Sequence, residues 1–276
     1  MFGLRAVLDG YRQYDLLLVD CLSLFINNLL HRFLTRIPVG TLPGSETVWR
    51  WSSAWFPLVG ALLGALLSLV WLGTLRAGEP VAACLVVTAS LWITGAFHED
   101  ALADTADALG GASDREQIFR ILKDSRIGSY GAAALGIALL IRVTALASLG
   151  SGAPLALIVV GCLSRTTPVW LMAVLPYVTA ESLSKSQQVT RVSFAQALLA
   201  TLWPLILVSV TTAQHFLAPV AALALVGVAL LVAIWLGASF RRRAGGVTGD
   251  FLGATQQVSE CAMLATLVWL QGGALR

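Results

Sequence analysis

The sequence predicts an all-α protein, a polytopic integral membrane helical bundle of about seven or eight membrane segments with short interfacial helices. Residues 1–276 are expected to form a single membrane-embedded domain. Hydrophobic residues make up 57% of the chain and charged residues 12%, whereas charged residues make up about 25% of a typical soluble domain. Several uncharged runs approach or exceed the roughly 20 residues that cross a bilayer. These observations exclude an ordinary soluble fold.

Each expected membrane segment is an apolar run that ends at charged residues, proline or glycine. The first run, residues 14–30, is interrupted by one aspartate and two asparagines, so it either spans the membrane or lies in the interface. Residues 115–123 are expected to form a short helix after a Gly-Gly pair. The other expected spans are, in chain order, residues 55–75, 81–97, 130–149, 154–175, 197–213, 216–237 and 258–275.

The basic residues gather in alternate connections. The four longer loops contain three, four, two and three Lys or Arg, whereas the short turns between them contain one in total. Under the positive-inside rule the longer loops face the cytoplasm, which predicts a multi-pass protein of the bacterial cytoplasmic (inner) membrane with a cytoplasm-facing site. The net charge of +3 is too small and too evenly spread to indicate a nucleic-acid partner. The longer loops are residues 31–50, 98–129, 176–196 and 239–257, and the turns are residues 76–80, 150–153 and 214–215.

Four carboxylates follow the run at residues 81–97. In a helix, Asp100, Asp104 and Asp107 stand at i, i+4 and i+7 and share one face, with Glu99 about a quarter-turn away. Two ionised carboxylates ~6 Å apart repel by roughly 3 kcal/mol at an effective dielectric of ~20, and a bound divalent cation would remove that cost. Carboxylate oxygens without His or Cys favour Mg²⁺. The alternative is a solvated acidic first turn, which suits the helix dipole.

Other polar motifs are expected on the same side of the membrane. Arg36 precedes an Ile-Pro pair, Lys123, Asp124 and Arg126 lie in one tetrapeptide, and Asp250 lies in a glycine-rich loop. Phosphoryl transfer uses this set, because carboxylates hold Mg²⁺, basic groups bind phosphate, and glycine turns let backbone amides approach phosphate oxygens. The sequence contains no Walker A or GxGxxG pattern. It therefore predicts a reaction on a diphosphate-activated amphiphile at the membrane surface.

Five co-linear motifs make the sequence resemble the cobalamin synthase family of adenosylcobinamide-GDP ribazoletransferases. The family usually has glycine where Ala101 and Ala108 stand here, which bears on local flexibility by roughly 1 kcal/mol per site. The motifs are TRIPVG at residues 35–40, FPLVG at 56–60, HEDALADTAD at 98–107, KDSRIGSYG at 123–131 and GGVTGDFLGA at 245–254.

The resemblance implies a Mg²⁺-dependent membrane enzyme. It would join adenosylcobinamide-GDP to α-ribazole, or to α-ribazole 5′-phosphate, and release GMP as the ribose 3′-hydroxyl attacks the phosphate on the cobinamide arm. Other implied partners are the lipid bilayer, a second copy in a homo-oligomer, and other corrinoid-pathway enzymes.

The predicted roles combine this reaction with the spacing of the side chains. The metal would be held by Glu99, Asp100, Asp104 and Asp107. The phosphates would contact Lys123 and Arg126, with Asp124 a further ligand or general base and Asp250 a ligand or hydroxyl-orienting group. The predicted catalytic residues are Asp104, Asp107, Lys123, Asp124, Arg126 and Asp250, and the predicted substrate-binding residues are Arg36, His98, Gly128, Arg165 and Gly249.

Several alternatives stand beside these roles. His98 could equally cap the end of a span, Arg142 within a span could pair with Glu260, and residues 241–243 favour a topological anchor over a substrate contact. Two other functions compete. A CDP-alcohol phosphotransferase also places acids on membrane helices, but its D-x2-D-G-x2-A-R spacing is absent. A cation-coupled transporter would carry its acids nearer the middle of the bilayer.

Overall fold

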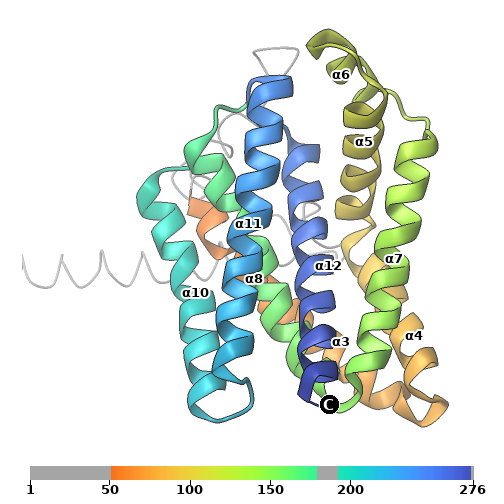
Figure 1. The fold of residues 1–276 in the computed structure, drawn as a ribbon, viewed down its shortest axis with the longest axis vertical. Coiled ribbons are helices and arrows are strands. Elements are labelled where there is room, and N and C mark those ends of the chain that lie inside the picture. Colours follow the sequence, from red (N-terminus) through yellow and green to blue (C-terminus); the bar gives the residue numbers. More distant parts are fainter. Residues whose placement is uncertain (1–50, 179–191, 275–276) are drawn as a thin grey trace, which may run out of the picture.

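The computed structural model describes residues 51–178 and 192–274. The expected segment at residues 14–30 and Arg36 lie outside the described residues. The described part consists of helices joined by turns and short loops, and its only β pairing is one isolated bridge between Tyr177 and Val247, which confirms the all-α prediction (Figure 1). Its long helices are α3 (Phe56–Thr74), α4 (Glu79–Thr94), α5 (Phe97–Gly111), α7 (Ser129–Leu149), α8 (Ala153–Val174), α10 (Phe194–Ala213), α11 (Pro219–Ala244) and α12 (Gly249–Ala274). The shorter ones are α6 (Arg115–Ile121), η1 (Ser52–Trp55), η2 (Leu75–Ala77) and η3 (Gly150–Gly152).

Four helical segments of the described residues are long and apolar enough to cross a membrane, which agrees with a membrane protein. One of these segments contains both α7 and α8, which run in opposite directions in Figure 1. Helices α4 and α5 qualify only as a pair, joined by an 89° bend, and the described residues thus give four or five candidate spans. The candidate segments are Ser52–Ala77, Ser129–Val174, Phe194–Ala213 and Pro219–Ala244.

Helices α3 and α8 pack with their backbones in close approach. A Cβ atom added at Gly60 would lie 2.0 Å from the carbonyl oxygen of Gly161, and one added at Gly64 would lie 2.2 Å from that of Leu157. The spacing Gly-x-x-x-Gly therefore works within this chain as it does between membrane helices, by letting two backbones touch. The hydroxyl of Ser68 donates to the carbonyl of Pro154 at 2.9 Å and adds a polar link.

Helix α12 begins earlier than the sequence predicts. Residues 245–253 were expected to be a glycine-rich loop, but the helix starts at Gly249 and Asp250 lies in its first turn. The physical reason is Thr248, whose hydroxyl accepts a hydrogen bond from the amide of Phe251 at 3.2 Å and whose carbonyl accepts from Leu252. The hydrogen bond to the Thr248 hydroxyl is an N-cap contact, which favours the start of a helix at this point.

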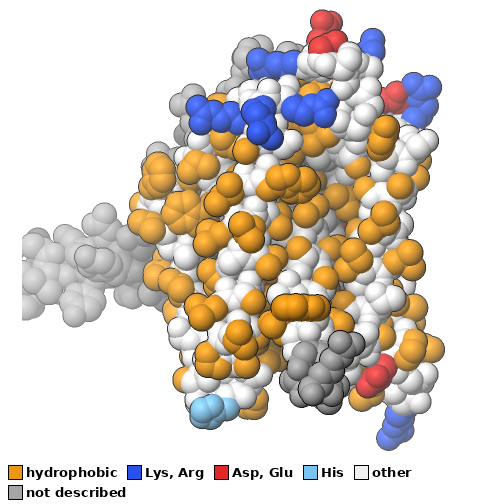
Figure 2. All heavy atoms as spheres, viewed as in Figure 1, with side chains coloured by type: hydrophobic (Ala, Val, Ile, Leu, Met, Phe, Trp, Pro, Cys, Tyr) orange, Lys and Arg blue, Asp and Glu red, His pale blue; other side chains and the backbone are white. Residues whose placement is uncertain are grey.

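The polar connections lie at one end of the bundle. Figure 1 shows α6, the far end of α5 and the C-terminal end of α11 together at the top, opposite the α10–α11 turn. Figure 2 shows Lys and Arg side chains gathered at the top of the face drawn, above a wide hydrophobic surface. Apolar residues of α11 such as Leu223 and Ile234 are 75% and 67% exposed, as lipid-facing side chains are. The end of the bundle formed by α6 and by the C-terminal ends of α5 and α11 is called the polar end below.

Candidate active site

A sharp backbone turn delivers the acid-bearing helix. The expected span at residues 81–97 ends at Thr94, and Gly95 and Ala96 both adopt left-handed backbone conformations with φ of 69° and 58°. Glycine at the end of a helix takes this conformation without strain, whereas alanine does not. The chain therefore bends here, and α5 leaves at an angle of 89° to α4.

The first carboxylate of α5 is held in a buried ionic network. Arg142 donates from Nη1 to Oε1 of Glu99 at 2.6 Å, and its Nε lies 3.0 Å from Oε1 of Glu260. Ser90 accepts from Nη2 of Arg142, and the side-chain amide of Gln257 donates to Oε1 of Glu99. The predicted Arg142–Glu260 pair is confirmed. Glu99 is thus an anchor for α5, and its role as a metal ligand stays a prediction.

The last carboxylate of α5 is held by backbone amides. Asp107 accepts from the N–H of Gly128 at 2.7 Å and of Gly131 at 2.8 Å, at the start of α7. A Cβ at either glycine would lie 2.5 or 2.3 Å from a carboxylate oxygen, so only glycine permits this approach. A carboxylate at a helix N-terminus also interacts favourably with the helix dipole. The contact explains the spacing of the two glycines in KDSRIGSYG, and it engages the amide of Gly128 with Asp107.

Three other carboxylates lack such anchors. Asp100 and Asp104 of α5 and Asp250 of α12 make no side-chain hydrogen bond or ion pair with another described residue. Partial burial raises the pKa of Asp104 to about 6, and the nearby charges of Asp100, Asp250 and Asp107 add to the rise. Burial, with the charge of Asp100, also raises the pKa of Asp250. These three carboxylates lie outside the four candidate membrane segments, because neither α5 nor α12 is by itself one of those segments.

Helices α5 and α12 meet closely beside these carboxylates. A Cβ at Gly253 would lie 2.6 Å from the methyl group of Ala101, so this glycine lets the two helices approach. The expectation that the 98–107 and 245–254 motifs lie together is therefore met, because Asp250 interacts electrostatically with both Asp100 and Asp104. Gly249, a predicted substrate contact, is the first residue of α12.

The basic tetrapeptide lies between α6 and α7. Arg126 donates from Nη2 to Asp124 at 2.6 Å, and the hydrogen bonds from Arg126 lower the pKa of Asp124 to about 2. Both side chains are solvent-accessible, with the Arg126 side chain 86% exposed. Lys123 is exposed as well. The structure thus places cationic groups in the loop that immediately precedes Gly128 and Gly131.

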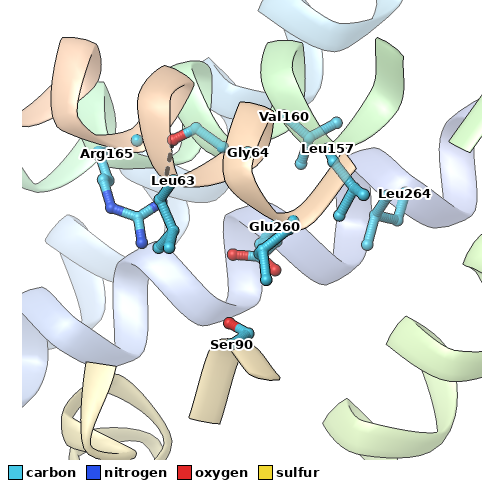
Figure 3. A pocket seen from close by; sticks show the side chains of 11 residues that line it. Leu63, Gly64, Ser90, Leu157, Val160, Arg165, Glu260 and Leu264 are labelled. Carbon is cyan, nitrogen blue, oxygen red and sulfur yellow. Dashed lines mark hydrogen bonds between the residues drawn. The ribbon is translucent and has the colours of Figure 1, made fainter. Parts of the chain in front are cut away.

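Two predicted substrate contacts lie inside the bundle. His98 and Arg165 are both buried, at 7% and 6% exposure. Arg165 donates from Nη1 to the carbonyl of Gly161, while its Nε has no partner among the described residues. It lines a cavity of about 20 Å³ together with Glu260 and Ser90 (Figure 3). That volume holds about one water molecule and no larger ligand.

Which residues could hold a metal follows from this arrangement. No group of three or more His, Cys, Asp or Glu side chains within residues 51–178 and 192–274 lies close enough to hold one ion. The donor chemistry nevertheless suits a hard cation, because Asp100, Asp104 and Asp250 offer carboxylate oxygens and Mg²⁺ keeps several waters while using one or two carboxylates. The residues therefore fit Mg²⁺ through the chemistry of their carboxylate oxygens.

Sequence reasoning missed several residues that hold the site together. These residues are Ser90 and Gln257, which contact side chains of other helices, Gln256, which contacts Ser164 of α8 and Glu260 of its own helix, and Arg243, which contacts backbone carbonyls at the end of α5. One signal was available, because Gln256, Gln257 and Glu260 form a polar run inside an expected apolar segment, and polar groups within a membrane bundle need partners.

Comparison with known proteins gives a consistent result. A family model described as cobalamin-5-phosphate synthase matches residues 28–268. The chain is 40% identical over 257 residues to the adenosylcobinamide-GDP ribazoletransferase of Leptothrix cholodnii, covering 87% of this chain and 93% of that protein. It is 39% identical to the protein of that name from Polaromonas sp., covering 84% and 92%, and 34% identical to the one from Brevibacillus brevis, covering 89% and 100%. No solved structure matches the chain.

Proposed function

Because the chain belongs to the cobalamin-5-phosphate synthase family, we propose that it joins adenosylcobinamide-GDP to α-ribazole or α-ribazole 5′-phosphate and releases GMP. The ribose 3′-hydroxyl attacks the phosphate attached to the cobinamide arm, the bond from that phosphate to GMP breaks, and the hydroxyl loses its proton. The product is adenosylcobalamin or its 5′-phosphate. The names of the relatives support the corrinoid substrate.

The observation that carries the proposed site is the contrast among six acids around α5. Glu99, Glu260 and Asp107 have partners, whereas Asp100, Asp104 and Asp250 have none among the described residues. The charges of Asp100 and Asp250 raise the pKa of Asp104, so these carboxylates repel one another, and a cation bound among them would remove that cost.

We propose that Mg²⁺ binds through one or two carboxylates of the set Asp100, Asp104 and Asp250 and keeps water as its remaining ligands, with Glu99 and Asp107 as anchors of the helix. The ion would neutralise charge on the pyrophosphate. Lys123 and Arg126 would bind phosphate oxygens from the loop before α7. Asp124 is a weak proton acceptor, because its pKa is about 2, and we assign it to orienting Arg126. Arg36 lies outside the described residues and stays a candidate substrate contact.

The orientation is part of the proposal. The basic residues at the polar end support a cytoplasm-facing site in the bacterial inner membrane, by the positive-inside rule. A cytoplasmic site has direct access to water-soluble α-ribazole and releases GMP into the compartment where nucleotides are used.

The decisive experiment is GMP release from adenosylcobinamide-GDP and α-ribazole by the purified protein in detergent. We expect Mg²⁺-dependent release, and in Asp104→Asn a loss of roughly 100-fold or more, the scale of losing a charge-stabilising group. Glu116→Gln is the matched control, because Glu116 is an exposed acid on α6 at the same end. Full activity in Asp104→Asn overturns the site. No GMP release by the unaltered protein, with CMP release from a CDP-alcohol or cation transport instead, overturns the function.

A further inference from the structure

The arginine triplet at the end of α11 contains one residue that differs from its neighbours. Arg241 and Arg242 are exposed, whereas Arg243 is half-buried. The guanidinium of Arg243 donates from Nη1 to the carbonyl of Leu109 and from Nη2 to the carbonyl of Ala112, at 2.7 Å for the latter. Both acceptors lie more than 130 residues away in sequence, at the end of α5. A topological anchor needs only the charge, and this arginine makes a specific contact.

The two carbonyls are ones that α5 cannot satisfy itself. The last C=O groups of a helix have no partner one turn further on. Here the amide of Ser113, which would continue the helix, is donated to the side chain of Gln117 instead. The planar guanidinium bridges the two free carbonyls, and its positive charge suits the negative end of the helix dipole.

Arg243 also lies close to Asp250 in sequence, at the connection between α11 and α12. This connection, residues 245–248, is called the hinge below. Asp250 follows Arg243 by seven residues, and the intervening chain has little freedom. Gly245 closes α11 with a φ of 83°. The amide of Val247 donates to the carbonyl of Pro176 at 2.9 Å, and the amide of Val178 donates to the carbonyl of Val247 at 2.9 Å. A Cβ at Gly246 would lie 2.1 Å from the Pro176 oxygen, so the hinge sits tightly on that segment.

We propose that Arg243 is a positioning residue that ties the end of α5 to this hinge, and so sets the separation between the α5 carboxylates and Asp250. The proposal rests on the proposed function, since that function gives the separation its meaning. Arg243 does not touch the three unpartnered carboxylates in any contact of the described residues. Its side chain binds backbone carbonyls at the end of α5, and its own backbone leads into the hinge, so its effect on the carboxylates is indirect.

The test compares Arg243→Gln with Arg243→Lys, and uses Arg241→Gln and Arg242→Gln as matched controls that remove the same charge from the same helix turn. GMP release is measured against Mg²⁺ concentration. Binding of Mn²⁺ alone is followed separately by loss of the free-ion electron paramagnetic resonance signal. Supporting groups of this kind are worth about 10- to 100-fold in metal affinity or activity.

We expect Arg243→Gln to weaken Mn²⁺ binding and raise the Mg²⁺ concentration for half-maximal rate by roughly 10-fold or more. Arg243→Lys should recover part of both, because lysine keeps the charge and can reach one carbonyl, and the two controls should match the unaltered protein. Equal losses in all three glutamine variants would show a charge or topology effect and overturn the proposal. So would unchanged Mn²⁺ binding in Arg243→Gln. Failure of the proposed function would appear differently, as no GMP release by the unaltered protein.

Discussion

The acids of this protein divide into two groups that share residue type and neighbourhood but not surroundings. Glu99, Glu260 and Asp107 each contact a buried arginine or a pair of backbone amides. Asp100, Asp104 and Asp250 make no such contact, and the charges of neighbouring acids in this group raise the pKa of Asp104 and of Asp250. The comparison shows that one acidic motif can supply both the anchors of a site and the groups that act in it. The anchored acids should govern stability, and the unpartnered ones should govern activity.

The largest expected effect is on stability, from Arg142→Leu. This change leaves buried Glu99 and partly buried Glu260 without the cation between them, and breaking a buried ion pair in this way costs about 3–5 kcal/mol. The measurement is detergent-induced unfolding followed by circular dichroism. Asp100→Asn serves as the control, because Asp100 is exposed and unpartnered. An unfolding midpoint for Arg142→Leu equal to that of the control would remove the division between the two groups.

A smaller effect is expected where Asp107 meets the start of α7. In Gly131→Ala the new methyl group would lie 2.3 Å from Asp107 Oδ2 and 2.8 Å from the carbonyl of Ala103, so we expect a loss of about 1–3 kcal/mol. Gly136 lies on the same helix with nothing within 4 Å of an added Cβ, and Gly136→Ala should be neutral or stabilising by up to about 1 kcal/mol. Similar unfolding midpoints in the two variants would contradict the anchor.

The unpartnered group should respond to pH. Asp104 has a pKa of about 6, so it is ionised above that pH and protonated below it. Because a metal binds the ionised form, we expect the apparent affinity for Mn²⁺ to fall by up to about tenfold per pH unit below pH 6. The stability of the metal-free protein should change in the opposite sense, declining as pH rises from about 4 to about 6, because the folded state binds the proton more tightly. A flat binding profile between pH 5 and 7 would rule out Asp104 as a ligand.

The smallest effect is expected in the exposed pair Asp124–Arg126. Asp124→Asn should change the unfolding midpoint very little, because solvent-exposed ion pairs contribute only about 0–1 kcal/mol. Its effect should appear in the rate of GMP release, through the orientation of Arg126. A large loss of stability would instead place this pair among the anchors.

Most of the described helices were predictable, whereas the division of the acids was not. Apolar runs located α3, α7 and α8 to within one residue at each end, because length and hydropathy decide which segments enter a bilayer. The spacing of Asp100, Asp104 and Asp107 placed them on one face of α5. It could not show that Asp107 faces the start of α7, because that depends on how two helices pack. The start of α12 was missed since four glycines suggested a loop, while the Thr248 cap favoured a helix.

The backbone contact between α3 and α8 also bears on how the chain is assembled. Helix α3 ends at residue 74 and α8 begins at residue 153. At a synthesis rate of about 5–20 residues per second, roughly 4 to 16 s pass before the ribosome has made the first residue of the partner. During that interval the α8 backbone that packs against Gly60 and Gly64 has not yet been synthesised. Early in its life the protein therefore carries a bare, glycine-lined strip that lipid or an insertion factor must cover.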